Sequence, residues 1–200
     1  MHSLSREYLQ IFLDIGENKF YSSFGLGVEL FKFKFIAPEV SIEYMGGSLE
    51  NQETTDPENP RVNLNFTSAG INGFIYSAAP KLISSFDDGS AFLIPKFSLA
   101  HAEAYAAYFE NDGADQYYLR REHVSAKDTF YYLSVDLGIE LYLPDSDSWS
   151  MAIYLSYTSN PSGKLFDKLE FENYDAYIPG ENLETVGLGL RLYYDPFEKR

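Results

Sequence analysis

The residues best suited to catalysis are a serine, a histidine and a glutamate within one short segment. Ser98, His101 and Glu103 are the types from which hydrolases build a nucleophile, a base and an orienting carboxylate. On a strand, Glu103 would share a face with His101, while Ser98, three residues from the histidine, would point to the opposite face. Because a nucleophile and its base must meet, we expect no catalytic residues here and a protein that is not an enzyme.

Metal-binding patterns are equally sparse. Asp145 and Asp147 resemble a fragment of a calcium loop, but the glycine and the distal glutamate of such a loop are missing from the sequence. The three histidines, His2, His101 and His123, lack the close spacing of a transition-metal site, and the chain has no cysteine. No glycine-rich phosphate loop or dinucleotide fingerprint occurs. We therefore predict neither a metal site nor a cofactor.

Length, charge and composition narrow the class of protein. The chain has 200 residues and a formal net charge of −15, and no shift in composition divides it, so we expect one domain over residues 1–200. The acidic excess disfavours nucleic acid and anionic lipid surfaces as partners, because both would be repelled. Aromatic residues make up 17% of the chain. Runs of β-forming residues broken by Gly, Pro, Asn and Asp indicate an all-β protein.

Three segments alternate clearly between apolar and polar or small residues, namely 130–143, 150–158 and 185–195. Successive side chains of a strand point to opposite faces, so each segment predicts a strand with one apolar face. In the first segment this aliphatic stripe consists of Tyr131, Leu133, Val135, Leu137, Ile139, Leu141 and Leu143. Helical spacing would scatter these residues around the whole circumference.

Five further segments predict strands with less regularity. Residues 9–15 and 39–44 alternate over short runs. In 24–35 the apolar set changes phase midway, which a β-bulge would explain. In 61–76 two glycines indicate kinks, and in 92–109 a proline and a series of alanines weaken the strand pattern and leave a partly helical segment as the alternative. The total is about eight strands, the number at which side chains just fill a closed barrel.

The expected connections alternate in length. The long ones are Gly46–Pro60, Glu110–Asp128 and Ser159–Glu184, and the shorter ones are Ile36–Pro38, Ala78–Ser90 and Pro144–Trp149. Outer-membrane barrels have this asymmetry, with long external loops, short periplasmic turns and an even number of strands. The sequence therefore predicts a closed antiparallel up-and-down transmembrane β-barrel of about eight strands.

The N-terminal residues bear on export. No apolar run approaches the roughly 20 residues of a membrane-spanning helix. The sequence from Met1 to Glu7 lacks the basic start and apolar stretch of a signal peptide. An exported barrel requires such a leader, so we expect that the native signal peptide is absent from this sequence.

Membrane and soluble barrels differ in which face of the strands is exposed to water. The face opposite the aliphatic stripe carries few charges and several small residues, whereas a soluble exterior carries Lys and Glu along whole strands. Small residues mixed with paired charges suit a narrow lumen. We predict an internal polar network of Glu29, Glu43, Asp136, Glu140 and Arg191. The alternative is a soluble lipocalin-like barrel that turns the stripe inward around an apolar ligand.

The last predicted strand resembles the C-terminal assembly signal of outer-membrane proteins. Thr185 is polar, Gly187 follows two positions later, and Leu190 and Leu192 flank one residue. The family usually stops on an aromatic residue, whereas here six residues follow the last tyrosine. The resemblance implies recognition by the barrel-assembly machinery of a Gram-negative outer membrane.

The strand pattern as a whole resembles the small OmpA/OmpX-like and OmpW-like barrels, and the tyrosine-rich, acidic-loop style is similar to the outer-membrane β-barrel domain common in Bacteroidota. This resemblance implies an integral outer-membrane protein in contact with outer-membrane lipid. We expect a structural or interaction role with a lumen plugged by side chains. A small outer-membrane enzyme that modifies lipid is the alternative.

Acidic residues concentrate in two of the expected loops. Their members are Glu50, Glu53, Asp56 and Glu58 in one loop and Asp167, Glu170, Glu172 and Asp175 in the other. Such clusters are usually solvated charge. They are also suited to bridging through divalent cations or to contacting another envelope protein, and these are the partners that we expect at the loops.

Overall fold

The structure is a computed structural model that describes residues 6–14, 19–49, 52–55, 63–111, 118–143, 146, 148–178 and 183–195. The described residues form nine strands and one short helix: β1 (Arg6–Asp14), β2 (Lys19–Glu29), β3 (Ile36–Leu49), β4 (Gln52–Thr55), β5 (Asn63–Phe86), β6 (Gly89–Asn111), β7 (Tyr118–Tyr142), β8 (Trp149–Asn160), α1 (Gly163–Phe166) and β9 (Leu183–Tyr194).

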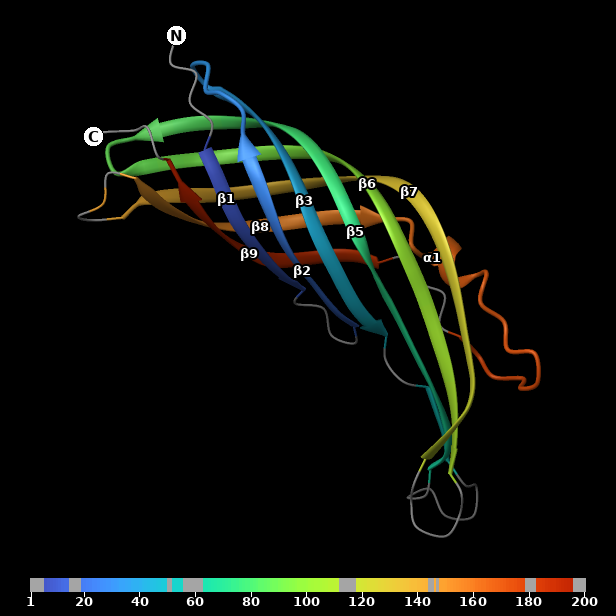
Figure 1. The fold of residues 1–200 in the computed structure, drawn as a ribbon. Helices are drawn as coiled ribbons and strands as arrows, with labels where there is room; N and C mark the ends of the chain where they lie inside the picture. The colour runs from blue at the N-terminus through green and yellow to red at the C-terminus, as the bar shows by residue number, and fades with distance from the viewer. Residues whose placement is uncertain are drawn as a thin grey trace.

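Eight of these strands close into a ring (Figure 1). Each pairs antiparallel with its neighbour in the chain, and β9 returns to pair with β1. The short β4 lies outside the ring, so β3 pairs directly with β5, from Ile36 opposite Leu82 to Ser48 opposite Gly70. The predicted closed antiparallel up-and-down barrel is confirmed.

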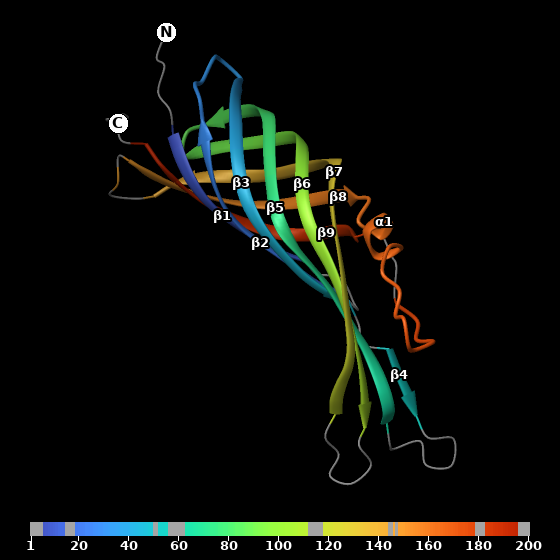
Figure 2. The same cartoon turned by 45° about the vertical axis from the view of Figure 1, so that its right-hand side comes forward.

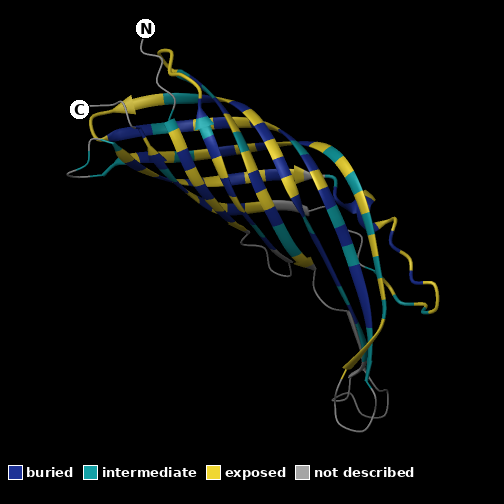
Figure 3. Ribbon diagram, viewed as in Figure 1, coloured by how far each residue is buried: buried dark blue, intermediate teal, exposed yellow. Residues whose placement is uncertain are grey.

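The aliphatic stripe lies on the outside of the ring. Leu133 and Leu137 are 65% and 58% exposed, whereas Asp136 and Glu140 between and beside them are buried. Figure 3 shows the alternation of buried and exposed residues along the strands around the barrel. An apolar outer face around a polar lumen is the arrangement of a membrane-spanning barrel. A soluble lipocalin-like barrel requires the reverse.

Three strands are far longer than a bilayer requires. β5, β6 and β7 contain 24, 23 and 25 residues, whereas a tilted transmembrane strand needs about 9–11. Their far halves leave the ring as a curved sheet that β4 joins (Figure 2). We call this sheet the arm and define it as residues 52–55, 63–72, 103–111 and 118–129.

The two ends of the barrel therefore differ. The start of β1 and the end of β9, together with the β2–β3 and β5–β6 turns and the described residues between β7 and β8, lie at one end, which we call the terminal rim (Figure 1). The arm and the segment 161–178, which includes α1, lie at the opposite end. No helix in the described part of the chain is long and apolar enough to cross a membrane.

Several predicted boundaries are wrong. Residues 30–35 are a turn beyond the end of β2, so the change of phase there marks the end of a strand and not a bulge. The predicted link at 78–90 is strand up to Phe86, because Pro80 fits the sheet opposite Pro38. The segment 92–109 has no helix and belongs to β6.

The predicted loop 110–128 is mostly strand as well. Its second half pairs with β6 as part of β7, with Asn111 opposite Tyr118 and Ala104 opposite Ala126. Outside the bilayer both faces of a strand tolerate polar residues, so the clear apolar alternation that marks a strand inside the membrane is weak here.

Candidate functional site

The five residues predicted to form an internal polar network all have buried side chains in the lumen. They come from four strands: Glu29 from β2, Glu43 from β3, Asp136 and Glu140 from β7, and Arg191 from β9. They are distributed over two clusters of ion pairs, each completed by cations from elsewhere in the chain.

The first cluster lies toward the terminal rim and is centred on Lys81. Its ammonium lies 2.5 Å from Glu29 Oε1 and 2.9 Å from Glu140 Oε2, and it also donates to the Tyr193 hydroxyl over 3.0 Å. Arg6 contacts the same two carboxylates at 3.1 and 2.8 Å. Two cations thus neutralise two buried acids, which offsets part of the cost of their desolvation.

The second cluster is centred on Asp136. Arg191 Nη2 lies 2.7 Å from Asp136 Oδ2, and Arg191 Nη1 lies 3.2 Å from Glu39 Oε1. Lys96 Nζ lies 3.0 Å from Asp136 Oδ2 and 3.9 Å from Glu43 Oε1. Each buried charge therefore has an opposite partner, which offsets part of the cost of desolvation.

Aromatic rings fill the space around the second cluster. The Arg191 guanidinium lies 4.8 Å from the Tyr154 ring centroid and 4.9 Å from that of Tyr8, within the range of cation–π attraction. These rings need glycine beside them. A Cβ at Gly189 would lie 2.0 Å from Tyr154 Cζ, and one at Gly27 would lie 2.2 Å from Tyr8 Cζ. Glycine in these strands therefore makes room for an inward ring on the neighbouring strand.

The described lumen retains a small cavity. Its volume is about 20 Å³, and Glu43, Lys96, Tyr132 and several serines line it. A polar cavity of this size holds about one water molecule. The lumen therefore suits fixed ion pairing and local hydration better than the binding of a small molecule.

Four charged lumen residues were missed by the sequence predictions: Arg6, Glu39, Lys81 and Lys96. Lys81 fell in a segment predicted to be a link, and Lys96 follows a proline. A signal was nevertheless present, because a buried carboxylate requires a cation and the prediction contained four acids for one arginine. The candidates for these cations were the lysines whose side chains point to the inner face of their strands.

The candidate catalytic residues are not brought together. Ser98 points into the lumen, where its hydroxyl lies 2.8 Å from that of Ser77. His101 is exposed on the outer face, and its Nδ1 lies 2.9 Å from Thr129 Oγ1. Glu103 pairs with Lys127 at 3.3 Å.

The candidate metal ligands give no site either. No group of three or more metal-ligating side chains occurs among the described residues. His2, Asp145 and Asp147 lie outside the described residues.

The inner face of the arm is covered by the segment 161–178. Two apolar side chains of this segment, Leu165 and Phe166, are each only 1% exposed. The rings of Tyr108 on β6 and Tyr174 in the segment are also in contact, with 4.4 Å between their centroids. The alanines of β6 form the floor beneath, since Ala104 and its neighbours are fully buried. Small residues there leave room for the large side chains of the segment.

Two acidic side chains of β7 tether the same segment. The Asp128 carboxylate accepts a hydrogen bond from the Lys168 ammonium, and this contact holds the pKa of Asp128 below its usual value. The Glu122 carboxylate accepts the backbone N–H groups of Glu172 at 2.7 Å and Asn173 at 3.2 Å.

The predicted acidic loops are described only in part. In the second loop Asp167, Glu170, Glu172 and Asp175 are exposed. In the first loop Glu53 belongs to β4, and the other three, Glu50, Asp56 and Glu58, lie outside the described residues.

One edge of the arm is open. β8 pairs with β7 only from Leu133 to Tyr142, so residues 119–132 of β7 pair with β6 on one side and, within the described part of the chain, with no strand on the other. A strand edge of this length is a template for pairing with another chain, although the Thr129 N–H already donates to the Asp128 carboxylate over 2.7 Å.

The residues of the predicted assembly signal lie on β9, the strand that closes the ring against β1. Gly187 faces the lumen, where a Cβ would meet the Phe12 ring. Leu190 faces outward and Leu192 lines a groove on the outer wall. Thr185 pairs with Thr158 of β8.

Solved structures that are similar to this chain include two bacterial proteins. The N-terminal β-barrel domain of Pseudomonas aeruginosa OprF matches with a TM-score of 0.42 and 12% identity over 98% of this chain and 99% of that one. The Yersinia pestis attachment invasion locus protein Ail, solved with the heparin analogue sucrose octasulfate, matches with a TM-score of 0.39 and 11% identity over 96% of each chain. No family model and no curated protein matches the sequence.

Proposed function

We propose that this protein is an integral outer-membrane barrel that holds the arm outside the cell, where the open edge of β7 binds an extended segment of a protein partner. The observation that carries the proposal is the unpaired edge over residues 119–132. Addition of a strand to such an edge gives affinity through main-chain hydrogen bonds, and side chains on alternate faces add specificity.

An outer-membrane location is supported by the barrel itself. An even number of antiparallel strands, an apolar outer wall and large structures at one end with short turns at the other are the features of bacterial outer-membrane barrels. Insertion would proceed through the barrel-assembly machinery, with Thr185, Gly187, Leu190 and Leu192 of β9 as the recognised residues. Outer-membrane lipid would then cover the aliphatic stripe.

A role as an anchor and not as a pore is supported by the lumen. Eight-stranded barrels have an interior that side chains just fill, and here ion pairs and aromatic rings occupy it around a cavity of about 20 Å³. The exposed acids of segment 161–178 stand beside the arm and would contact divalent cations or an envelope protein.

The orientation is tested with single cysteines, because the chain has none of its own. Ser125→Cys places a thiol on the exposed face of the arm, and Asp88→Cys places one in the β5–β6 turn at the terminal rim. A membrane-impermeant maleimide should label intact cells carrying Ser125→Cys and label Asp88→Cys only after disruption of the envelope. The opposite pattern would overturn the proposal.

Binding at the edge is tested with proline. Adjacent residues of a strand direct their N–H groups to opposite sides, so of Val124 and Ser125 one faces β6 and the other the open edge. Proline at the edge-facing position should abolish photo-crosslinking of a probe at Lys127 to its partner on cells while the barrel still resists heat in detergent. Unchanged crosslinking would exclude strand addition at this edge.

A further inference from the structure

The turn between β2 and β3 is a basic, aromatic segment at the terminal rim. Residues 31–35 alternate phenylalanine and lysine, and Phe33 and Phe35 are 55% and 63% exposed. Lys32 and Lys34 are exposed as well, and among the described residues neither ammonium pairs with a carboxylate. The Lys34 ammonium lies 5.6 Å from the Phe33 ring centroid. In a chain of net charge −15, a turn with two exposed ammonium groups and exposed rings indicates a ligand with a phosphate and an apolar part.

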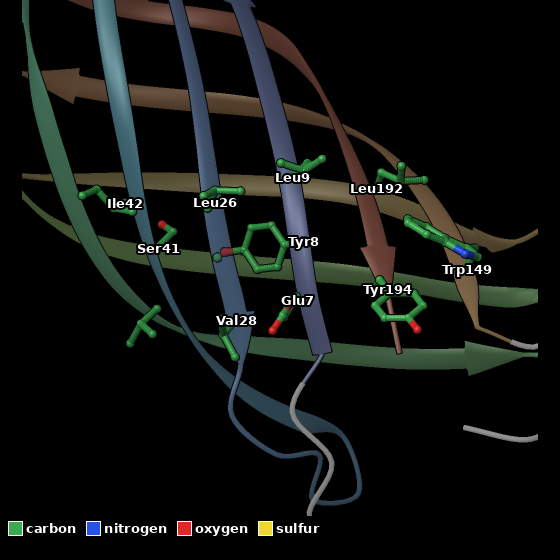
Figure 4. Close-up of a pocket in the computed structure, with 12 residues that line it drawn as sticks. Glu7, Tyr8, Leu9, Leu26, Val28, Ser41, Ile42, Trp149, Leu192 and Tyr194 are labelled. Carbon is green, nitrogen blue, oxygen red and sulfur yellow. The ribbon is translucent and has the colours of Figure 1, made fainter. Parts of the chain in front are cut away.

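An apolar groove begins beside this turn on the outer wall of the barrel. It has a volume of about 600 Å³, within the range of ligand sites. Its walls are formed by outward side chains of β1, β2, β3 and β9: Leu9, Leu26, Val28, Val40, Ile42 and Leu192. Figure 4 shows Leu26, Val28 and Ile42 along one side, with the β2–β3 connection just beyond Val28.

The charges around the groove are of both signs. Glu7 lines it and is exposed, opposite Val28 in the β1–β2 pairing. Val28 is in turn paired with Val40, and the Leu30 N–H donates to the Pro38 carbonyl, so the turn continues directly from the groove. A carboxylate thus stands on one strand and two ammonium groups on the adjacent hairpin.

We infer that the turn and the groove bind one phospholipid with an ethanolamine headgroup. The lipid phosphate contacts Lys32 and Lys34, the lipid ammonium donates to Glu7, and an acyl chain lies in the groove. This inference rests on the proposed membrane position of the barrel. A purely anionic lipid would be repelled by Glu7 and the acidic chain, and a choline headgroup has no N–H to donate.

The test uses native mass spectrometry of the full chain, released from nanodiscs that contain equal amounts of phosphatidylethanolamine, phosphatidylcholine and phosphatidylglycerol of distinct mass. We expect retention of one phosphatidylethanolamine. K32Q/K34Q should lower that retention by roughly 30-fold, since each lysine near a lipid phosphate is worth about fivefold in affinity. E7Q should remove the preference for ethanolamine over glycerol, and Val40→Trp should fill the groove and displace the lipid.

The matched control is K127Q/K164Q, which removes two exposed lysines at the opposite end of the molecule. It should retain the lipid as the parent does. Equal retention of all three lipids, or an unchanged signal in K32Q/K34Q, would overturn the inference, as would a turn that binds a soluble protein and no lipid. Failure of the parent chain to insert into any nanodisc would instead count against the proposed membrane position.

Discussion

The two halves of β7 belong to one unbroken strand but have opposite surfaces. Near the terminal rim its outward residues are Leu133, Val135, Leu137, Ile139 and Leu141. In the arm the residues of the same face are Arg121, His123, Ser125, Lys127 and Thr129, all exposed. The pairing with β6 stays in register from Leu141 to Glu122 and shifts by one residue at Arg121. The change of residue type therefore marks a change of solvent, from hydrocarbon to water.

The residue types on the inner face of β7 also differ between the barrel and the arm. Within the barrel this face carries Ser134, Asp136 and Glu140, and the two carboxylates pair with charged and polar groups in the lumen. In the arm, Val124 and Ala126 pack against the apolar cluster around segment 161–178. A single strand is thus apolar outside and polar inside in the membrane, whereas beyond it the outer face is polar and the inner face combines Val124 and Ala126 with Glu122 and Asp128. Aromatic pairs lie at the boundary, with Phe97 and Tyr131 stacked at 5.6 Å, as in the belts of membrane barrels.

The largest test of this contrast is the removal of a lumen cation. Arg191→Met leaves Asp136 and Glu39 buried with fewer partners, which should lower the free energy of unfolding by about 3–5 kcal/mol. Urea unfolding of the protein in vesicles, followed through Trp149, the single tryptophan of the chain, measures the change.

The control for this variant lies in the arm. Arg121→Met breaks an ion pair with Glu110 whose side chains are 40% and 44% exposed, and it should cost less than about 1 kcal/mol. Equal effects of the two variants would show that the lumen charges are not desolvated as their burial indicates.

A second test compares the outer faces of the two halves. Leu137→Lys places a charge where lipid chains should lie and should destabilise the barrel by about 2–4 kcal/mol. Ser125→Lys makes a comparable change on the same face of the arm and should leave the free energy of unfolding within about 0.5 kcal/mol of the parent. If Leu137→Lys is tolerated equally well, the bilayer does not reach this level of β7.

The barrel was predictable because the membrane enforces one rule along each strand. Hydrocarbon accepts only apolar side chains, so Leu133 through Leu141 alternate without exception and reveal both the strand and its outer face. The same parity placed Asp136 and Glu140 inward. Parity alone did not single out their cationic partners. Lys96 lies on the adjacent strand β6, directly after a proline, and Lys81 lies on β5 in a segment that the sequence predicts to be a link.

The arm was not predictable because no comparable rule applies beyond the bilayer. Residues 118–128 have water on one face and segment 161–178 on the other. Apolar and polar residues therefore alternate only weakly there, and the sequence predicts a loop. The alanine series of β6 is equally compatible with a helix when the sequence is considered alone. The structure explains these alanines, because Leu165 and Phe166 occupy the space above them.

The smallest expected effect concerns the attachment of segment 161–178 to the arm. The Lys168 ammonium lowers the pKa of Asp128, so the folded arm binds this proton less readily than the unfolded chain does. The contact therefore stabilises the segment above the ordinary carboxyl pKa of 3.8, and its contribution is lost as pH falls through the lower folded value. Protection should be constant from neutral pH to about pH 4 and decline below it.

Hydrogen exchange of the Leu169 N–H, which donates to the Phe166 carbonyl at 2.9 Å, reports this attachment once it is corrected for intrinsic rates. Asp128→Asn should be less protected at neutral pH and should lack the decline that Asp128 causes, so the difference between variant and parent should vanish in acid. Glu122 is present in both proteins, and the comparison therefore isolates Asp128. A difference that persists at low pH would mean that packing of Leu165 and Phe166 alone, without the charge on β7, fixes the segment to the arm.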